Sequence, residues 1–219
     1  MYDFVTIGSA TIDAFVESEA ADIVSVSTKK ASTEFMAFPY GAKVEIDSFR
    51  TAVGGGGINA AANLANLGFN TSAIFKIGED FQGKTIKLRV KQANVDTSNI
   101  IESKTESSGF SIILLSFEGN RTVLAHRGTN GTIKEDEINY EAIKNAKWLY
   151  IAPLNGNSGA VLDKIAHFAE ENNTNVIINP GSSSLKKGLK YFEKILATAE
   201  VVVMNKEEAS LVTGIEVRP

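Results

Sequence analysis

The chain of 219 residues contains no cysteine and only two histidines, His126 and His167. Without thiols, disulfide bonds, cysteine-ligated zinc and cysteine nucleophiles are all excluded. The two histidines show no paired spacing, which argues against a histidine-rich metal site. The chemistry of this protein must therefore rest on carboxylates, amides, hydroxyls and backbone groups.

An excess of basic residues and a long apolar run are also missing. The formal net charge is −4, whereas a general binder of phosphate backbones needs a basic surface. No apolar stretch approaches the length of a membrane span, about 20 residues. The N-terminus enters an apolar stretch without the basic start of a signal peptide. We expect a cytoplasmic protein that binds neither nucleic acid nor membrane.

The composition is that of a globular domain, with 43% hydrophobic and 22% charged residues. Apolar runs predict strands at Phe4–Ile7, Thr71–Ile77, Trp148–Ala152, Asn175–Ile178 and Val201–Met204. Helices are expected after the glycines at 54–57, after Asp80, and near 135–145, 158–171 and 189–199. Alternating helices and fully apolar strands indicate a parallel sheet covered on both faces.

Two β-rich excursions interrupt this alternation, at about residues 14–50 and 109–127. The second contains two apolar runs around a short Gly/Asn turn at 118–121, which predicts a β-hairpin. We expect the two excursions to pair as a small subdomain. There is no obvious linker between domains.

The strongest local signal is the run Gly54 to Gly57, which leads directly into an alanine-rich helix that ends at Gly68. Glycines let backbone N–H groups approach a ligand closely, and a helix N-terminus favours polar or anionic groups. A tight strand-to-helix connection is the structural alternative, but it accounts for one or two glycines and not for four. The run matches neither G-x-G-x-x-G nor a lysine-bearing P-loop, whereas Asn59 suits hydroxyl recognition.

Two further places carry polar side chains directly after strands. Asp13 follows the first strand, where ligands of parallel sheets bind, although alone it reads as a loop or capping aspartate. Asn205 and Glu208 lie one helical turn apart and could hold Mg²⁺ through water, or simply cap a helix. Asn179 to Gly181, Arg127 and Asn130 lie where they could also reach a ligand.

These motifs together resemble the ribokinase-like, or pfkB, carbohydrate kinases. The resemblance rests on Ile7 to Asp13, on Gly54 to Asn59 with Gly68, on Ile77 to Asp80, and on Asn205 to Glu208, which is similar to the family's N-x-x-E motif. Val95 to Ser98 and Arg127 to Asn130 follow in the family's usual order. The resemblance covers essentially the whole chain.

The resemblance implies a three-layer α/β/α sandwich with a small β-sheet lid, made here from the excursions at 14–50 and 109–127. It implies phosphoryl transfer from ATP, with Mg²⁺, to a hydroxymethyl group of a sugar or related polyol or nucleoside. The residues that would hold the substrate hydroxyls are Asp13, Gly55, Gly56, Gly57 and Asn59. Asn205 and Glu208 would lie near the phosphates, with Glu208 holding Mg²⁺ through water. A homodimer through the lid is a further expectation.

The chain departs from the family pattern in two ways. It contains no G-A-G-D-like element, so the expected aspartate base is absent and no catalytic residue can be assigned. We therefore expect a domain that lacks its C-terminal part, either as a fragment or as a naturally short relative. Where ribokinase has lysine in the glycine motif, this chain has Gly56, so adenosine, fructose and acid sugars stay open as substrates.

Two other function classes compete with the kinase hypothesis. A non-catalytic sugar- or nucleoside-binding protein is favoured by the missing base. A Rossmann-type oxidoreductase is disfavoured by the poor match to G-x-G-x-x-G and by the β-rich excursions.

Overall fold

The computed structural model describes residues 1–29, 31–117, 119–181, 185 and 189–216. The chain divides into two compact units. The first comprises Met1–Thr11, Val53–Gly109 and Arg127–Pro219, and the second comprises Ile12–Ala52 and Phe110–His126. Each unit contains a sheet of its own, and we call the second unit the β unit.

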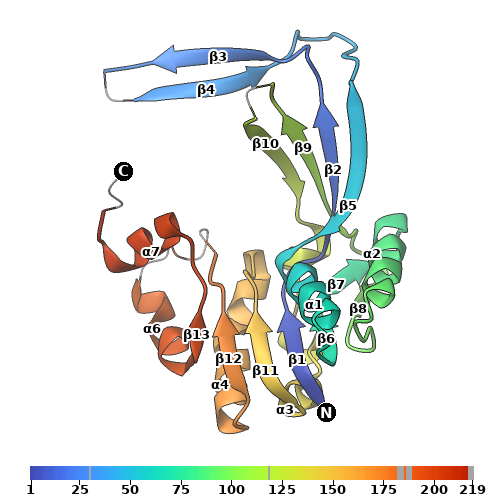
Figure 1. Cartoon of the computed structure of the whole chain (residues 1–219), viewed down its shortest axis with the longest axis vertical. Helices are drawn as coiled ribbons and strands as arrows, with labels where there is room; N and C mark the ends of the chain where they lie inside the picture. Colours follow the sequence, from blue (N-terminus) through green and yellow to red (C-terminus); the bar gives the residue numbers. More distant parts are fainter. Residues whose placement is uncertain (30, 118, 182–184, 186–188, 217–219) are drawn as a thin grey trace. The chain divides into compact units, whose positions relative to one another are not determined.

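The first unit is built on a parallel sheet with the strand order β13-β12-β11-β1-β6 (Figure 1). Its strands are β1 (Tyr2–Ile7), β6 (Thr71–Ile74), β11 (Ala146–Ile151), β12 (Asn175–Ile178) and β13 (Val201–Val202). Each neighbouring pair is parallel, with Phe4 of β1 opposite both Trp148 and Thr71. The predicted parallel sheet is therefore confirmed.

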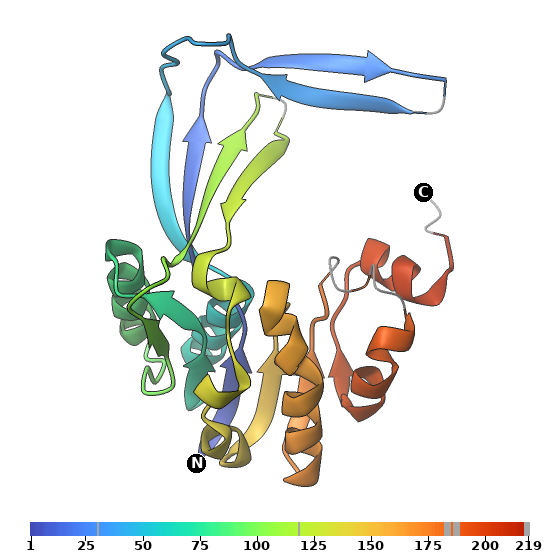
Figure 2. The same cartoon turned by 180° about the vertical axis from the view of Figure 1, so that it is seen from behind.

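Helices cover both faces of this sheet. α1 (Gly56–Asn66) packs on β1 and β6, and lies in front of the sheet in Figure 1. α3 (Tyr140–Lys144) and α4 (Leu162–Glu171) pack on the opposite face, which Figure 2 shows from behind, and α6 (Leu189–Thr198) lies beside α4. The result is the predicted three-layer α/β/α sandwich. None of the helices in the described ranges has the length and hydropathy to span a bilayer.

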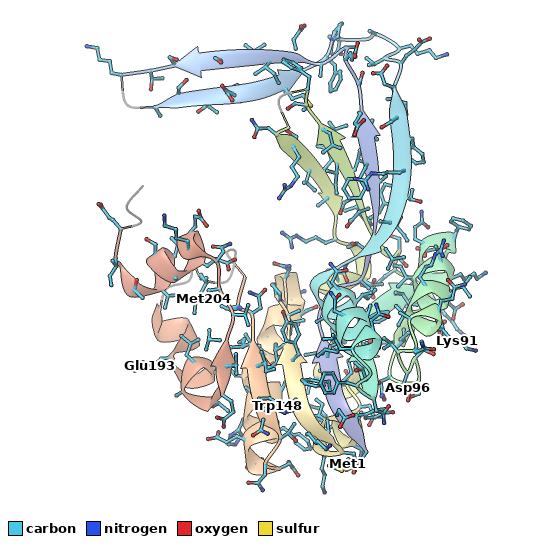
Figure 3. All side chains as sticks on the ribbon, viewed as in Figure 1. Met1, Lys91, Asp96, Trp148, Glu193 and Met204 are labelled. Carbon is cyan, nitrogen blue, oxygen red and sulfur yellow. The ribbon has the colours of Figure 1, made fainter. Side chains whose placement is uncertain are left out.

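The core of the first unit explains why its strands are apolar along their whole length. Val5, Thr6 and Ile7 on β1, and Leu149 and Ile151 on β11, are completely buried. Because helices cover both faces of the sheet, side chains that point to either face of a strand lie in the core. Near the start of β1, Phe4 stacks on Trp148 with 6.4 Å between ring centroids; Trp148 is labelled in Figure 3.

Several boundaries differ from those expected from sequence. The run Thr71–Ile77 forms two strands, because β7 (Lys76–Gly78) leaves β1 and pairs with β8 (Ile101–Ser103). Phe75 lies at the break, where its carbonyl accepts the N–H of Ile101 at 2.9 Å. The helices expected near 135–145 and 158–171 each begin as short 3₁₀ turns, η2 (Glu135–Glu137) and η3 (Gly156–Val161).

The β unit contains a four-stranded sheet with the order β10-β9-β2-β5 and a separate two-stranded sheet, β3-β4. Its strands are β2 (Thr11–Glu17), β3 (Asp22–Ser27), β4 (Ser32–Ala37), β5 (Ser48–Gly54), β9 (Gly109–Leu115) and β10 (Arg121–His126). β9 and β10 are antiparallel neighbours, so the predicted hairpin is confirmed. Glu118, in its expected turn, lies outside the described residues.

Candidate functional site

The glycine run forms a junction with the turn that follows β1. β1 ends at Ile7, the chain turns through Gly8, Ser9 and Ala10, and the N-terminus of α1 packs against this turn. A Cβ on Gly8 would lie 2.6 Å from the Cβ of Ala152, which follows β11. The junction therefore lies at the carboxyl ends of β1 and β11, where ligands of open parallel sheets bind.

Packing accounts for three of the four glycines. A Cβ on Gly55 would lie 2.3 Å from the carbonyl oxygen of Ser9, and Gly55 has φ 105°. A Cβ on Gly56 would lie 2.9 Å from the Cβ of Ala152, and one on Gly57 would lie 2.9 Å from the nitrogen of Gly8. The expectation that a tight connection explains only one or two glycines was therefore wrong, because three segments meet here without room for side chains.

The first N–H groups of α1 are already engaged. Gly56 N–H donates to Ser9 Oγ at 3.1 Å, and Gly57 N–H donates to the carbonyl oxygen of Ser9 at 3.2 Å. A phosphate at this helix start would have to displace Ser9. By contrast, the exposed side-chain amide of Asn59 has no hydrogen-bond partner among the residues that the structure describes. The junction is better suited to hydroxyl recognition through Asn59 than to phosphate binding through the backbone.

Asp13 lies in a strand and not in the loop that its sequence context suggested. β2 begins at Thr11, so Asp13 is its third residue. Its neighbours Ile12 and Ala14 are buried, while Asp13 is half-buried on the other face of the strand. Asp13 belongs to the β unit and the glycine junction to the first unit, and its role with a ligand stays a prediction.

Asn205 and Glu208 form a reciprocal capping box at the start of α7 (Lys206–Thr213). Glu208 N–H donates to Asn205 Oδ1 at 2.7 Å, and Asn205 N–H donates to Glu208 Oε2 at 3.1 Å. Glu208 is 7% exposed. In the folded chain, Asn205 and Glu208 therefore cap the N-terminus of α7, which was one of the two roles that the sequence suggested for them.

A magnesium site at this position has few ligands. Across the described ranges, no group of three or more histidine, aspartate and glutamate side chains is placed to hold a metal ion. Glu208 is a single carboxylate with one oxygen already in the capping box. These residues fit Mg²⁺ only through water, which is a common way for proteins to bind this ion.

Asn130 does not face a ligand. It is 6% exposed, its Oδ1 accepts the N–H of Ala10 and its Nδ2 donates to the carbonyl oxygen of Ala10, both at 2.8 Å. The suggestion that Asn130 could reach a ligand was wrong, because both ends of its amide bind backbone. Arg127, at the start of the same turn, is exposed.

The loop at Asn179 to Gly181 connects segments that follow neighbouring strands of the sheet. Asn179 Nδ2 donates to the carbonyl oxygen of Val203 at 2.6 Å, which ties the end of β12 to the residue after β13. Gly181 has φ 68°, and a Cβ there would lie 2.6 Å from the Cβ of Pro153. This loop is thereby held against the segment that also packs on Gly56.

Sequence reasoning missed a buried lysine. Lys76 is 3% exposed and pairs with Glu137 at 2.7 Å and Glu106 at 3.1 Å. Burial lowers the pKa of Lys76, but hydrogen bonds and charge from the two glutamates outweigh it and hold the pKa above its ordinary value. No motif marks this lysine, which lies inside the run Thr71–Ile77 that the sequence predicts as one strand.

Asp80 caps α2 (Phe81–Gln92), as predicted. Its carboxylate accepts the N–H of Gly83 at 2.7 Å and both the N–H and the hydroxyl of Ser108 at 2.7 Å. Burial raises the pKa of Asp80, but these hydrogen bonds outweigh it, so the pKa lies below its ordinary value. Asp80 is therefore engaged in holding the start of α2 and the segment at Ser108.

Known proteins were compared with this chain. A sequence family described as pfkB family carbohydrate kinase matches residues 16–217. The chain belongs to the pfkB carbohydrate kinase family. Ribokinase of Staphylococcus aureus (strain COL) is 31% identical over 180 residues, which are 81% of this chain and 57% of the relative. Ribokinase of Haemophilus influenzae is 26% identical over 175 residues, which are 78% of this chain and 54% of the relative.

Solved structures share this fold. The crystal structure of Sa239 matches with a TM-score of 0.80 and 25% identity, over 100% of this chain and 66% of that chain. Arabidopsis thaliana ribokinase, solved with ribose and ATP, matches with a TM-score of 0.78 and 22% identity, over 97% of this chain and 63% of that chain. The chain thus spans between half and two thirds of the length of these four proteins.

Proposed function

We propose that this pfkB chain carries the polyol-binding part of a carbohydrate kinase. The observation that carries the proposal is the junction of the Gly8–Ala10 turn with the start of α1, at the carboxyl ends of β1 and β11. Its N–H groups are engaged by Ser9, while Asn59 keeps a donor and an acceptor for hydroxyls. The reaction would be transfer of a phosphoryl group from ATP to a hydroxymethyl group of a sugar, polyol or nucleoside.

In this proposal, Asp13 and Asn59 recognise the substrate through different chemistry. The carboxylate of Asp13 accepts hydrogen bonds from two hydroxyls, and Asn59 can donate to one hydroxyl and accept from another. Gly55, Gly56 and Gly57 contribute by letting the backbone pack without side chains. The β unit acts as a lid that excludes water, so that the phosphoryl group passes to the polyol and not to solvent.

ATP and Mg²⁺ would bind near α7 in this proposal. Glu208 would hold Mg²⁺ through water, and Asn205 keeps the helix start in place through the capping box. When bound, Mg²⁺ supplies charge neutralisation for the phosphates. We assign no residue of this chain to adenine binding or to the catalytic base.

The test is substrate-dependent consumption of ATP. The longest natural form of this chain is incubated with ATP, Mg²⁺ and a panel of D-ribose, D-fructose, adenosine and a keto-deoxy acid sugar. The proposal expects at least one member to raise ATP consumption above the rate without acceptor. Folded protein that neither consumes ATP nor binds any member in calorimetry would contradict it.

A non-catalytic polyol-binding protein is the alternative function. It would need only the residues that bind the polyol and no catalytic base. Binding of a panel member in calorimetry, without any acceptor-dependent ATP consumption, would select this alternative. Both candidates use the same junction and the same Asp13.

We also propose that the β unit forms a homodimer contact. The cross-strand pairs Ile113–Val123 and Ile112–Leu124 alternate along β9 and β10, so they lie on opposite faces of the sheet. Val123 is 48% exposed and Leu124 is 53% exposed. An apolar sheet needs cover on both faces, and a second copy can supply one of them. Light scattering should give the mass of two chains; one chain's mass at every concentration would contradict the contact.

A further inference from the structure

Asn130 occupies a place that the proposed function does not use. It lies in the 3₁₀ turn η1 (Gly128–Gly131), which begins two residues after β10 ends. Its side-chain amide makes a paired hydrogen bond with the backbone of Ala10, through the N–H and the carbonyl oxygen, at 2.8 Å each. In sequence the two residues are 120 positions apart.

The turn that holds Asn130 is itself fixed from three sides. Thr129 Oγ1 donates to the carbonyl oxygen of Lys76 at 2.7 Å, and Thr129 N–H donates to that of Ser107 at 2.9 Å. Ser158 Oγ donates to the carbonyl oxygen of Asn130 at 2.9 Å. Lys76, Thr129, Asn130 and Ser158 are buried, whereas Ser107 is exposed, so the amide of Asn130 extends from a turn that is held mainly by buried groups.

Two glycines make room for this amide and for the segment that it binds. A Cβ on Gly109, the first residue of β9, would lie 2.1 Å from Asn130 Nδ2 and 2.8 Å from the carbonyl oxygen of Ala10. A Cβ on Gly55 would lie 2.9 Å from the Cα of Ala10. Ala10 is therefore contacted by the turn of Asn130, by the start of β9 and by the glycine junction.

Ala10 is also the last but one residue of the first unit before the chain enters the β unit at Ile12. Asp13 follows three positions after Ala10 in the chain. We propose that Asn130 is a positioning residue for polyol binding: by holding Ala10, it fixes both the start of the strand that carries Asp13 and the backbone against which Gly55 packs. This inference rests on the proposed function.

The geometry defines which changes should matter. Asn130→Asp keeps the shape and the acceptor but loses the donor, and places a carboxylate oxygen against the carbonyl oxygen of Ala10. Gly109→Ala drives a methyl group into the same amide. Ser158→Ala is the matched control for stability, because it removes buried hydrogen bonds to Asn130 and Ile133 but leaves the amide pair with Ala10. Gly131→Ala is the control for a glycine in the same turn, since a Cβ there meets nothing within 4 Å.

The experiment measures three properties of the whole chain for each variant. Thermal unfolding gives stability, hydrogen exchange reports opening of the segment 8–16, and calorimetry gives affinity for whichever of D-ribose, D-fructose and adenosine binds the wild type. Asn130→Asp and Gly109→Ala are expected to speed exchange in segment 8–16 and to weaken binding about tenfold, as loss of one buried hydrogen bond implies. Ser158→Ala is expected to lower stability but to weaken binding clearly less than Asn130→Asp, because the amide pair with Ala10 remains, and Gly131→Ala is expected to change neither.

The outcomes separate the two proposals. If the wild type binds a panel member and Asn130→Asp binds it equally well, the positioning role is overturned while the proposed function stands. Equal losses of affinity in Asn130→Asp and Ser158→Ala would likewise overturn it, because affinity would then follow stability alone. If exchange of segment 8–16 does not change in Asn130→Asp, the anchor itself is overturned. If the wild type binds no member, the proposed function fails, and the positioning role fails with it.

Discussion

The starts of α1 and α7 both carry residues that the sequence suggested would face a ligand, but they are built in different ways. α1 follows β5 of the β unit, and α7 follows β13 of the first unit. At α1, the N–H groups of Gly56 and Gly57 are taken by Ser9, from a segment 47 or more positions away. At α7, Asn205 and Glu208 satisfy each other within one turn.

The difference concerns what each helix start requires from the rest of the fold. The α1 start depends on close packing of Gly8, Ser9 and Ala152, so any added side chain disturbs several segments. The α7 start is local, and its loss should affect one helix. The start of α2 is intermediate in this respect, because Asp80 accepts one hydrogen bond from its own helix, at Gly83, and two from the distant Ser108. Substitutions at the three starts should therefore differ in size.

The largest effect is expected at the α1 junction. Gly55→Ala should lower the free energy of unfolding by about 3 kcal/mol, because the methyl group overlaps Ser9 and the backbone φ is positive. Gly68→Ala is the matched control, since Gly68 also has a positive φ, 93°, but nothing lies within 4 Å of the added Cβ. Urea unfolding of both variants measures the difference, and equal losses would show that packing at Ser9 does not matter.

An intermediate effect is expected at α2. Asp80→Ala should cost about 2 kcal/mol at neutral pH, because it removes a cap and leaves the N–H of Ser108 without its acceptor. The pKa of Asp80 is lower in the folded than in the unfolded chain, so its contribution is complete above the unfolded value, about 4, and is lost as the pH falls through the folded value. In urea unfolding between pH 7 and pH 2.5, the difference in free energy of unfolding between the wild type and Asp80→Ala should shrink as the pH falls. A difference that stays constant over this range would contradict the expected role of Asp80.

The smallest effect is expected at α7. Asn205→Ala should cost about 1 kcal/mol, the usual price of an N-cap, and hydrogen exchange should rise within α7 only. Glu207→Gln, an exposed change in the same turn, should stay within about 0.5 kcal/mol. A loss at Asn205 as large as that of Gly55→Ala would remove the distinction between a local and a packed helix start.

The sequence predicted most of the first unit because its elements carry strong local signals. Fully apolar runs gave β1, β11 and β12, and Gly68 and Asp80 marked a helix end and a helix start. The break at Phe75 was missed, because the choice of strand partner is a tertiary effect: β7 pairs with β8, more than 20 positions along the chain. An apolar run alone does not identify its neighbours.

The candidate site was predicted less completely. Local pattern revealed the glycines, Asp13 and the pair at α7, but not that Ser9 occupies the N–H groups of α1. Asn130 was noticed for its chemistry, yet its partner, the backbone of Ala10, is distant in sequence. Buried hydrogen bonds between such segments have no spacing rule, so only the folded chain reveals them.

The central claim, that this chain binds a polyol through Asp13, is tested most directly by calorimetry. D-ribose, D-fructose and adenosine are titrated into the wild type, into Asp13→Ala, and into Asp22→Ala as an exposed control in the same unit. The account predicts that the wild type and Asp22→Ala bind the same ligand, and that Asp13→Ala binds it at least about 100-fold more weakly, since two charged hydrogen bonds are lost. Equal affinity of Asp13→Ala and the wild type would contradict it.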